Sequence, residues 1–562
     1  MTKDSGKELR GEGVSRRAFL EGASLAALAA VGIASTGCAP KGAAATGSAA
    51  NSGATANATV DTTHTWSAEI DNPVWALEEI GEPTETIKAD VCILGAGATG
   101  LAAGLQANQL GLKAVLLEKK AAAGGSFIGC EGLFAVNSHL QTELGYNYTV
   151  NEFIEDCLVY HHFVPEIDLM RAYFSKSGET IKWLEDLGVE FDFVQAQAGS
   201  RVAWHIPKGS PKPGAYCTQQ MIAAAQNAGL QIELETPAKQ ILVDDDGKVE
   251  GVLALKKDGT VVKVEARAVI IGTGGYASND DFVNYISGAI PGSYLHLGMD
   301  GRDADGIKMG HDVGAELCSA PGTMNLCGPT PVDVPFSTLA FGVATQPNSL
   351  WVNQDGDRYV RESIITTNFS NAGLAAKPVE KTFIIFSQNC FDDLESGHGA
   401  YTGNGVFYFP NKPMEGLTQA IAELSDTSMK KGNTIAELAT ACGLDAKKLQ
   451  ATVDRYNELC AKGEDKDMLK PAEYMKPLET GPYYAFNCLN SLFFTVGGLH
   501  VSPKTEVLGS DLQPIPGLYA GGCDAGGLYG DCYDYIITPG SQGAWCVNSG
   551  RIAAESAAEY LK

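Results

Sequence analysis

A glycine-rich turn between two apolar strands, within residues 89–118, places the strongest constraint on how this chain folds. The apolar run 89–94 leads into Gly95-Ala96-Gly97-Ala98-Thr99-Gly100, a helix-like stretch follows, and a second apolar run ends on Glu118. This order of strand, G-x-G-x-x-G turn, helix, strand and acid is typical of a Rossmann-like unit that binds a dinucleotide. Gly95 permits the tight turn, Gly97 admits the pyrophosphate, and Gly100 lets the helix pack on the strand. Glu118 is predicted to accept hydrogen bonds from ribose hydroxyls.

Further glycine segments extend this pattern along the chain. Gly124-Gly125-Ser126 follow the second strand, residues 269–276 read V-I-I-G-T-G-G-Y, and residues 517–524 read G-L-Y-A-G-G-C-D. Shorter matches occur at 305–309, 495–498 and 549–551. As a set, these segments resemble the fumarate reductase/succinate dehydrogenase flavoprotein family, in its soluble flavocytochrome-like branch. The resemblance runs from about residue 89 to the C-terminus.

The resemblance implies an α/β fold with FAD as the cofactor. In this family a Rossmann-like FAD-binding domain is split in sequence, which places its parts here at 85–314 and 491–562. An α+β capping domain, 315–490, is inserted between them. The residues that the pattern and the resemblance together assign to FAD are Gly95, Ala96, Gly97, Gly100, Glu118, Gly124, Gly125, Ser126, Thr273, Gly274, Gly275, Gly497, Gly498, Gly522, Asp524, Gly540 and Ser541.

The family's dicarboxylate-binding side chains are not kept in this sequence. Phe493 and Phe494 stand where the family has a pair of histidines, Ile537 replaces an arginine, and Ala320 replaces a further histidine. A buried carboxylate without a partner costs several kcal/mol, so the sequence predicts that fumarate and succinate are rejected. The predicted substrate instead carries a double bond conjugated to a carbonyl in a cyclic or aromatic compound.

A tyrosine-rich segment, 529–535, supplies candidates for the proton donor that such a reduction requires. The 3-ketosteroid dehydrogenases, on a related FAD fold, place a catalytic tyrosine before a Pro-Gly pair in this region. We therefore predict Tyr535 as the donor and Tyr533 as the second candidate, although both tyrosines also fit a packing role. Arg361 is a third candidate, because the family's own acid is an arginine nearby. Its alternative interpretation is an ion pair with Glu362.

Four further side chains are predicted to contact the substrate. Phe493 and Phe494 offer an apolar wall near the flavin. Tyr529 belongs to the tyrosine-rich segment, and His205 lies where the resemblance places a positively charged segment. The alternative interpretation of His205 is that it packs in the core and does not contact the substrate.

Composition bounds the partners and metals. A net charge of −26 makes nucleic acid an unlikely partner, because affinity for phosphates comes from Lys and Arg. The 14 cysteines include no C-x-x-C pair, so no metal site is predicted from spacing. Similar exported gut-bacterial reductases of enone lactones are associated with an iron–sulfur cluster, which the resemblance therefore leaves open.

The source of electrons also follows from the resemblance. The sequence contains one dinucleotide fingerprint, and FAD accounts for it. The donor is therefore expected to be an external carrier, a cytochrome or a quinol-linked membrane protein. Three functions remain open at this point: an ene-reductase of a small molecule, a ketosteroid-like dehydrogenase that runs the reaction in the other direction, and a non-catalytic flavin electron carrier.

The first residues are read as a targeting segment. Residues 15–20, S-R-R-A-F-L, precede the apolar stretch 18–33 and resemble a twin-arginine export signal. The predicted signal spans 1–38, and Cys38 is a candidate lipidation site, with ordinary cleavage nearby as the alternative. Residues 39–65 are rich in Ala, Gly, Ser and Thr, which is typical of a flexible linker. The expected location is the periplasm or cell envelope, with a membrane anchor if Cys38 is lipidated.

Overall fold

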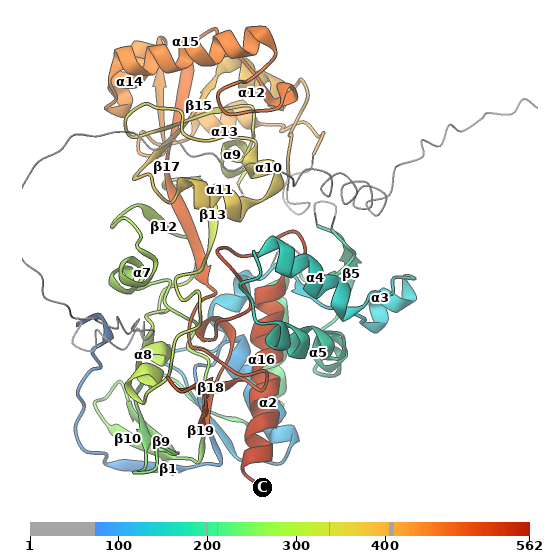
Figure 1. Cartoon of the computed structure of the whole chain (residues 1–562), viewed down its shortest axis with the longest axis vertical. Coiled ribbons are helices and arrows are strands. Elements are labelled where there is room, and N and C mark those ends of the chain that lie inside the picture. The colour runs from blue at the N-terminus through green and yellow to red at the C-terminus, as the bar shows by residue number, and fades with distance from the viewer. Residues whose placement is uncertain (1–72, 198–199, 211, 336–337, 404–409) are drawn as a thin grey trace, which may run out of the picture. The chain divides into compact units, whose positions relative to one another are not determined.

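The computed structural model describes residues 73–562, apart from 198–199, 211, 336–337 and 404–409 (Figure 1). The predicted export signal, the candidate lipidation site Cys38 and the linker 39–65 lie outside the described residues. Within the described ranges, no helix has both the length and the apolar character needed to cross a membrane.

The central element is a six-stranded sheet in the order β18-β19-β11-β2-β3-β7. Its strands from β19 to β7 pair in parallel, and β18 pairs antiparallel with β19. Side chains of β2, β3 and β11 are buried throughout, as expected for parallel strands covered on both faces. The strands are β2 (Val91–Leu94), β3 (Ala114–Leu117), β7 (Gln231–Glu233), β11 (Ala268–Ile271), β18 (Glu506–Leu508) and β19 (Pro514–Ala520).

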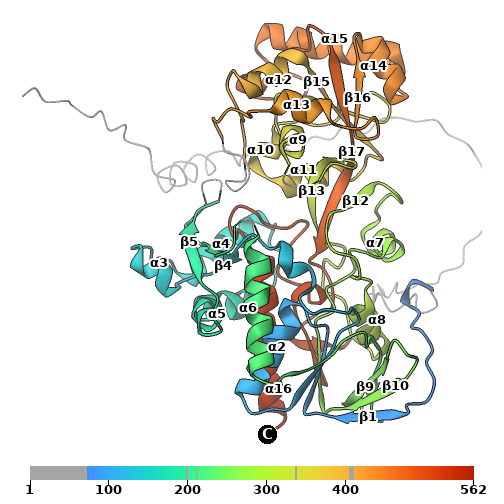
Figure 2. The same ribbon diagram turned by 180° about the vertical axis from the view of Figure 1, so that it is seen from behind.

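Helices α2 (Ala98–Gln109), α6 (Pro213–Asn227) and α16 (Ser541–Tyr560) pack beside this sheet (Figures 1 and 2). Small residues let α2 and α16 come close together: a Cβ at Gly550 would lie 2.3 Å from the Thr99 carbonyl oxygen. The α16 residues between Ala544 and Ala557 are mostly buried. The C-terminal helix is therefore part of the core that forms around the fingerprint helix.

Two smaller sheets and several helices complete this part of the chain. The four-stranded sheet has the order β1-β10-β9-β8, and the three-stranded sheet has the order β4-β6-β5. Their strands are β1 (Glu85–Lys88), β4 (Leu133–Phe134), β5 (Phe191–Gln195), β6 (Trp204–Pro207), β8 (Ala238–Val243), β9 (Val249–Leu255) and β10 (Val261–Glu265). The accompanying helices are α3 (His139–Glu143), α4 (Val150–Tyr160), α5 (Ile167–Asp186), α7 (Asp280–Ser287) and α8 (Asp305–Asp312).

A further sheet is built around one long strand, β17 (Tyr483–Thr495). Its order is β12-β17-β15-β14, and β13 and β16 also pair with β17. Strand β17 crosses the predicted boundary at residue 491, and β12 joins this sheet from the first predicted FAD-binding segment. The other strands are β12 (Tyr294–His296), β13 (Met324–Pro331), β14 (Leu350–Asn353), β15 (Thr382–Ser387) and β16 (Met429–Gly432).

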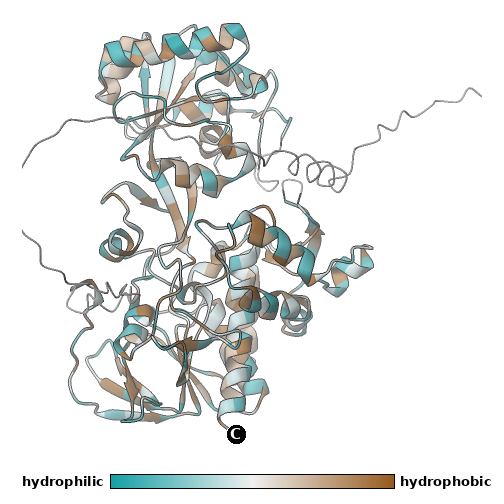
Figure 3. Cartoon of the chain, viewed as in Figure 1, coloured by the Kyte–Doolittle hydropathy of each residue, from teal (hydrophilic) through white to brown (hydrophobic). Residues whose placement is uncertain are grey.

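Helices around the β17 sheet bury one face each. In α15 (Ala446–Lys462) the buried residues Leu449, Val453, Tyr456 and Leu459 recur at helical spacing, so teal and brown alternate along it in Figure 3. The remaining helices are α9 (Leu339–Ala344), α10 (Ile364–Thr367), α11 (Phe369–Ala376), α12 (Gln388–Glu395), α13 (Leu417–Ala422) and α14 (Ile435–Cys442). Parallel and antiparallel sheets with packed helices confirm the predicted α/β fold class.

Candidate active site

The fingerprint turn owes its shape to two close backbone contacts. Gly95 has φ +96°, and a Cβ there would lie 2.4 Å from the Gly272 carbonyl oxygen. A Cβ at Gly100 would lie 1.9 Å from the Gly95 carbonyl oxygen, so only glycine lets α2 start this close to β2. Gly97 lies opposite Gly125, and both line a cavity. The turn therefore leaves an open cradle at the N-terminus of α2, where phosphate is favoured.

Glu118, at the end of β3, is held by backbone donors beside this cradle. Its carboxylate accepts the Ala96 N–H at 2.8 Å and the Lys120 N–H at 2.8 Å. Glu118 lines the same cavity as Gly97. The acid is therefore oriented before any ligand binds, as the hydrogen bonding of a ribose requires.

The cavity has a volume of about 480 Å³ and continues from the cradle to a group of aromatic side chains. The glycine turn of 272–274 and the first residues of α16 line its middle part. Its aromatic part is lined by residues from α9, α11, β17 and the C-terminal loop, namely Phe341, Phe369, Phe493, Phe494, Tyr533 and Tyr535. The structure thus brings the predicted apolar wall and both predicted donor tyrosines to the cavity that contains the fingerprint.

Tyr535 has two polar partners in this aromatic part. Its hydroxyl donates to Asn325 Oδ1 at 2.9 Å and lies 3.0 Å from Cys327 Sγ. Burial raises the pKa of the Tyr535 hydroxyl well above its ordinary value, so the group stays protonated at neutral pH. The hydroxyl therefore holds a proton at neutral pH, and a hydrogen bond from the Cys327 thiol can stabilise the oxygen when that proton leaves.

Tyr533 packs among rings. Its ring centroid lies 4.8 Å from that of Tyr535 and 5.2 Å from that of Phe494, in edge-to-face geometry. Burial also raises the pKa of Tyr533 above its ordinary value. Both tyrosines are consequently neutral hydroxyl donors: the polar partners of Tyr533 are Ser541 and the Gln542 backbone at the start of α16, and those of Tyr535 are Asn325 and Cys327.

Comparison with known proteins assigns the chain to a family, because residues 90–534 match the FAD binding domain family. The chain belongs to this family of flavoproteins. It is similar to vinyl phenol reductase of Lactiplantibacillus plantarum, with 32% identity over 84% of this chain and 96% of that protein. It is also similar to urocanate reductase of Eggerthella lenta, with 30% identity over 78% of this chain and 70% of that protein.

A solved structure agrees with these relatives. The open conformation of a flavocytochrome c3 fumarate reductase superposes with a TM-score of 0.68 at 26% identity, covering 85% of this chain and 79% of that one. The predicted resemblance to fumarate reductase flavoproteins is confirmed. FAD is the cofactor of this flavoprotein, which is an oxidoreductase acting on carbon–carbon bonds.

Removal of the Glu118 carboxylate should weaken FAD binding. In Glu118→Ala the ribose loses its acceptor, and the Ala96 and Lys120 N–H groups lose theirs. We expect the Kd for FAD to rise by about 10- to 100-fold, the range for one hydrogen bond to a charged group. Fluorescence titration of the apoprotein with FAD measures this Kd. Glu316→Gln, a carboxylate outside the cavity lining, is the control. An unchanged Kd in Glu118→Ala would contradict the assignment.

The predicted FAD residues of the flavoprotein divide into two sets. Those that line the cavity are Gly95, Gly97, Glu118, Gly125, Ser126, Thr273, Gly274 and Gly540. Those placed behind the lining are Ala96, Gly100, Gly124, Gly275, Gly497, Gly498, Gly522, Asp524 and Ser541. The second set supports the turns of the first.

Asp524 illustrates this supporting role. Its buried carboxylate accepts from Thr273 Oγ1 at 2.8 Å and from the N–H groups of Gly274 and Gly275 at 2.8 and 3.1 Å. Gly274 and Gly275 both have positive φ, so Asp524 stabilises a turn that a non-glycine sequence would strain. A Cβ at Gly498 would lie 2.4 Å from the Asp524 carbonyl oxygen, which explains that glycine as well. In this structure Asp524 shapes the cavity from behind.

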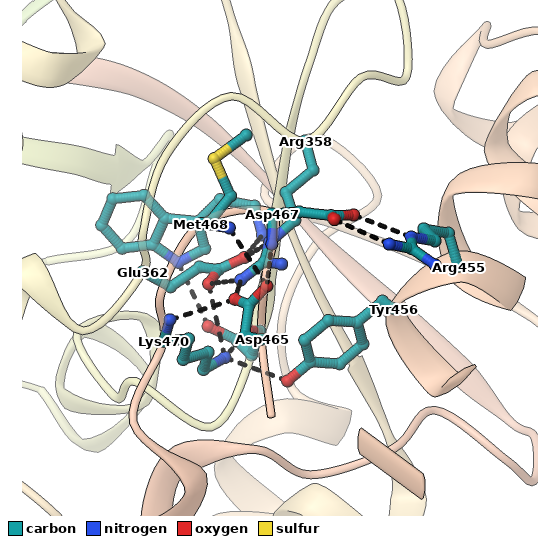
Figure 4. A network of polar contacts seen from close by, with 10 residues as sticks. Arg358, Glu362, Arg455, Tyr456, Asp465, Asp467, Met468 and Lys470 are labelled. Carbon is teal, nitrogen blue, oxygen red and sulfur yellow. Dashed lines mark hydrogen bonds and ion pairs between the residues drawn. The ribbon is translucent and has the colours of Figure 1, made fainter. Parts of the chain in front are cut away.

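Arg361 lies away from the cavity. Its side chain is exposed and does not line the cavity, and Glu362 pairs instead with Arg358 at 2.7 Å and with Lys470 at 3.5 Å. Figure 4 shows Arg358 between Glu362 and Asp465. The structure therefore does not place Arg361 as a proton donor, and the ion pair expected with Glu362 belongs to Arg358.

His205 and Tyr529 are also placed outside the cavity lining. His205 is buried, with Nε2 at 2.6 Å from Ser138 Oγ and Nδ1 at 3.2 Å from the Leu133 carbonyl oxygen. Burial lowers the pKa of His205 to about 4, so it is a neutral packing residue. The Tyr529 hydroxyl bonds Ser541 Oγ at 2.8 Å and supports the start of α16. Neither side chain reaches a substrate here, because each is held in the core.

Several polar residues of the cavity were not predicted from the sequence. Glu131, Arg302, Asn325, Cys327 and Trp204 line it. Arg302 donates from Nε to the Met299 carbonyl oxygen at 2.7 Å and from Nη1 to that of Phe493. Glu131 is a single carboxylate in the glycine-rich stretch 124–136 that follows the predicted second strand, and a lone carboxylate carries no spacing signal.

Each cysteine in the described part of the chain is a free thiol. Across those same residues, no group of three or more His, Cys, Asp or Glu side chains is arranged to hold a metal ion. The iron–sulfur cluster therefore stays a prediction from the resemblance alone.

Proposed function

We propose that this flavoprotein reduces a carbon–carbon double bond conjugated to a carbonyl group or aromatic ring, in a cyclic or aromatic substrate that is not a dicarboxylate. The main observation in support is that Tyr535 and its partners Asn325 and Cys327 line the same cavity as the FAD fingerprint. Several phenylalanine side chains form another part of that cavity wall. Phe493 and Phe494 replace the charged groups that a dicarboxylate needs. The name of the relative vinyl phenol reductase, an alkene on an aromatic ring, supports this substrate class.

In the proposed reaction, residues of the cavity wall hold the proton, position it and exclude water. FAD, when bound and reduced, supplies a hydride to one carbon of the double bond. Tyr535 holds a proton at its hydroxyl oxygen for the other carbon, and Asn325 fixes that oxygen in place. The Cys327 thiol, 3.0 Å away, can donate to the tyrosine oxygen as its proton leaves. The phenylalanine side chains exclude water and stack on a flat substrate.

Electrons are proposed to come from an external carrier, a cytochrome or a quinol-linked membrane protein outside the cytoplasm. The twin-arginine-like pattern at 15–20 supports export, and the similarity to a flavocytochrome supports a haem protein as the donor. In this proposal the protein acts in the periplasm or cell envelope, with Cys38 as its lipid anchor.

An anaerobic assay with reduced methyl viologen tests the reaction. The FAD-loaded protein is offered cyclic enones, cinnamic compounds, hydroxystyrenes and fumarate, and dye oxidation is followed. We expect turnover of the aromatic or cyclic alkenes and at least about 100-fold less with fumarate, because a buried unpaired carboxylate costs several kcal/mol. If no alkene oxidises the dye while saturated ketones reduce the flavin, the protein is a dehydrogenase. If fumarate is the best substrate, the proposed substrate class is wrong.

A further inference from the structure

Glu131 is a carboxylate residue in the cavity wall, and no other described residue forms a hydrogen bond with its side chain. It lies between Cys130 and Gly132, which line the cavity with it. Burial alone shifts its pKa, raising it to about 7, and no donor among the described residues offsets that burial. The residue is half-buried in the cavity lining, where a bound ligand can reach its carboxyl group.

The segment that carries Glu131 is fixed against the start of α16. A Cβ at Gly540 would lie 2.3 Å from the Gly132 carbonyl oxygen, and Cys130 Sγ donates to that same oxygen at 3.2 Å. The charge of Glu131 acts on the Cys327 thiol, which is the partner of Tyr535. Glu131 is therefore a rigidly placed carboxyl group near the proposed proton donor.

None of the cations that line the cavity donates a hydrogen bond to Glu131 in the described structure. Lys119 pairs with Asp303 at 2.8 Å and with Asp305 at 2.7 Å, and Lys120 donates to the Asp300 carbonyl oxygen. Arg302 donates to backbone carbonyl oxygens from Nε and Nη1, while its buried Nη2 and the buried Trp204 Nε1 have no hydrogen-bond partner among the described residues. Since none of these donors is bonded to Glu131, a ligand can supply one, and in an aromatic cavity the fitting donor is a hydroxyl on an aromatic ring.

We propose that Glu131 binds the ring hydroxyl of a hydroxylated aryl alkene and exchanges its proton during the reduction. This inference rests on the proposed function and names its substrate class. A phenol hydroxyl has an ordinary pKa of about 10, so it donates to the carboxylate and does not lose its proton in the resting complex.

The step balances as follows for an alkene attached to the ring. The carbon distal to the ring takes a proton from Tyr535 while the hydroxyl proton passes to Glu131, and the ring oxygen becomes a carbonyl. FAD, if bound and reduced, would supply a hydride to the carbon attached to the ring. The ring would then be aromatic again, with Glu131 returning the proton to the oxygen. The alkene gains one hydride and one proton, Glu131 ends as it began, and solvent restores the Tyr535 proton.

Binding to the oxidised FAD-loaded protein tests this without turnover. The probes are 4-ethylphenol and 4-ethylanisole, in which a methyl group replaces the hydroxyl proton, and calorimetric titration gives their Kd values. We expect the wild type to prefer the phenol by about 10- to 100-fold, and Glu131→Gln to lose most of that preference. Glu316→Gln, which changes a carboxylate outside the cavity lining, should keep it. Equal preference in wild type and Glu131→Gln overturns the inference.

The pH dependence of the wild type gives a second readout that needs no variant. Because the acceptor is the carboxylate, the preference should be largest above pH 7 and fall as the pH drops through about 7. Burial raises the pKa of Cys130 and Cys327, on which the charge of Glu131 acts, and of Tyr535, the partner of Cys327, so these groups stay protonated across that range. A preference independent of pH overturns the inference. Failure of the viologen assay overturns the proposed function instead, because this binding test does not depend on turnover.

Discussion

Replacement of Tyr535 by Phe is expected to lower kcat for alkene reduction by about 10²- to 10⁴-fold, the usual contribution of a positioned general acid. The change removes one oxygen atom and keeps the ring against Tyr533 and Phe369. FAD binding and reduction of the flavin by dithionite do not involve this oxygen, so FAD content and the rate of flavin reduction by dithionite should stay the same. Stopped-flow oxidation of the reduced flavin by the alkene isolates the affected step.

Tyr533→Phe is the matched control for this experiment. Tyr533 lies in the same wall, has a burial-raised pKa as well, and packs against Phe494 with its centroid 5.2 Å away. If Tyr535 is the donor, Tyr533→Phe should keep kcat within about tenfold, below the usual range for loss of a general acid. The reverse pattern would make Tyr533 the donor. Full activity in both variants would leave neither tyrosine as the acid.

The residues that sequence patterns located best are those whose chemistry depends on local backbone geometry. Gly95 and Gly100 form contacts that any Cβ would block, and such contacts impose a fixed spacing on the sequence. Glu118 follows at a distance set by one helix and two strands. Phe493, Phe494, Tyr533 and Tyr535 were placed together because they precede or follow such glycine turns.

Adjacency in the sequence did not predict which charged side chains form ion pairs. Glu362 lies next to Arg361 in the chain but pairs with Arg358, four residues earlier, in a segment without regular secondary structure. Asp465, the other partner of Arg358, is 107 residues away. His205 was singled out, yet its neighbour Trp204 lines the cavity, because successive residues of a strand point to opposite faces.

Glu131 escaped prediction for a different reason. A lone carboxylate in a glycine-rich stretch carries no spacing signal, and its significance comes from the absence of a partner among the described residues. Only the folded chain shows that Cys327, Asn325 and Tyr535, which come from β13 and the C-terminal loop, gather in the cavity wall with it. The acid–base chemistry of this site is therefore a property of the assembled cavity.

Loss of the Arg358 cation is expected to destabilise the fold more than any other single charge removal proposed above. Arg358 donates from Nε and Nη2 to Glu362, each at 2.7 Å, and from Nη2 to Asp465 at 2.7 Å (Figure 4). Both carboxylate side chains are fully buried. In Arg358→Met they keep their charge and lose their main partner, which typically costs about 3–5 kcal/mol of unfolding free energy. Denaturation in urea, followed by tryptophan fluorescence, measures the change.

The loss of unfolding free energy in Arg358→Met should depend on pH, because the network contains a carboxyl group with a shifted pKa. Burial of Asp465 acts to raise its pKa, but hydrogen bonds from Arg358 and from backbone N–H groups outweigh burial and lower the pKa to about 2. A lowered pKa stabilises the fold at pH values above the unfolded value of about 4, and this contribution disappears as the pH falls towards 2. The stability difference between wild type and Arg358→Met should therefore be full at pH 7 and shrink below pH 4.

Arg455→Met is the control that separates burial from charge. Arg455 bonds Asp467 at 2.8 Å through two nitrogens, so its geometry matches that of Arg358, but both side chains are exposed (Figure 4). Solvent screens this pair, so its loss should move the urea midpoint only slightly. Equal destabilisation by the two variants would mean that burial of Glu362 and Asp465 does not decide the cost. A large effect confined to Arg358→Met would show that the stability of the fold depends on one buried cation shared by two carboxylates.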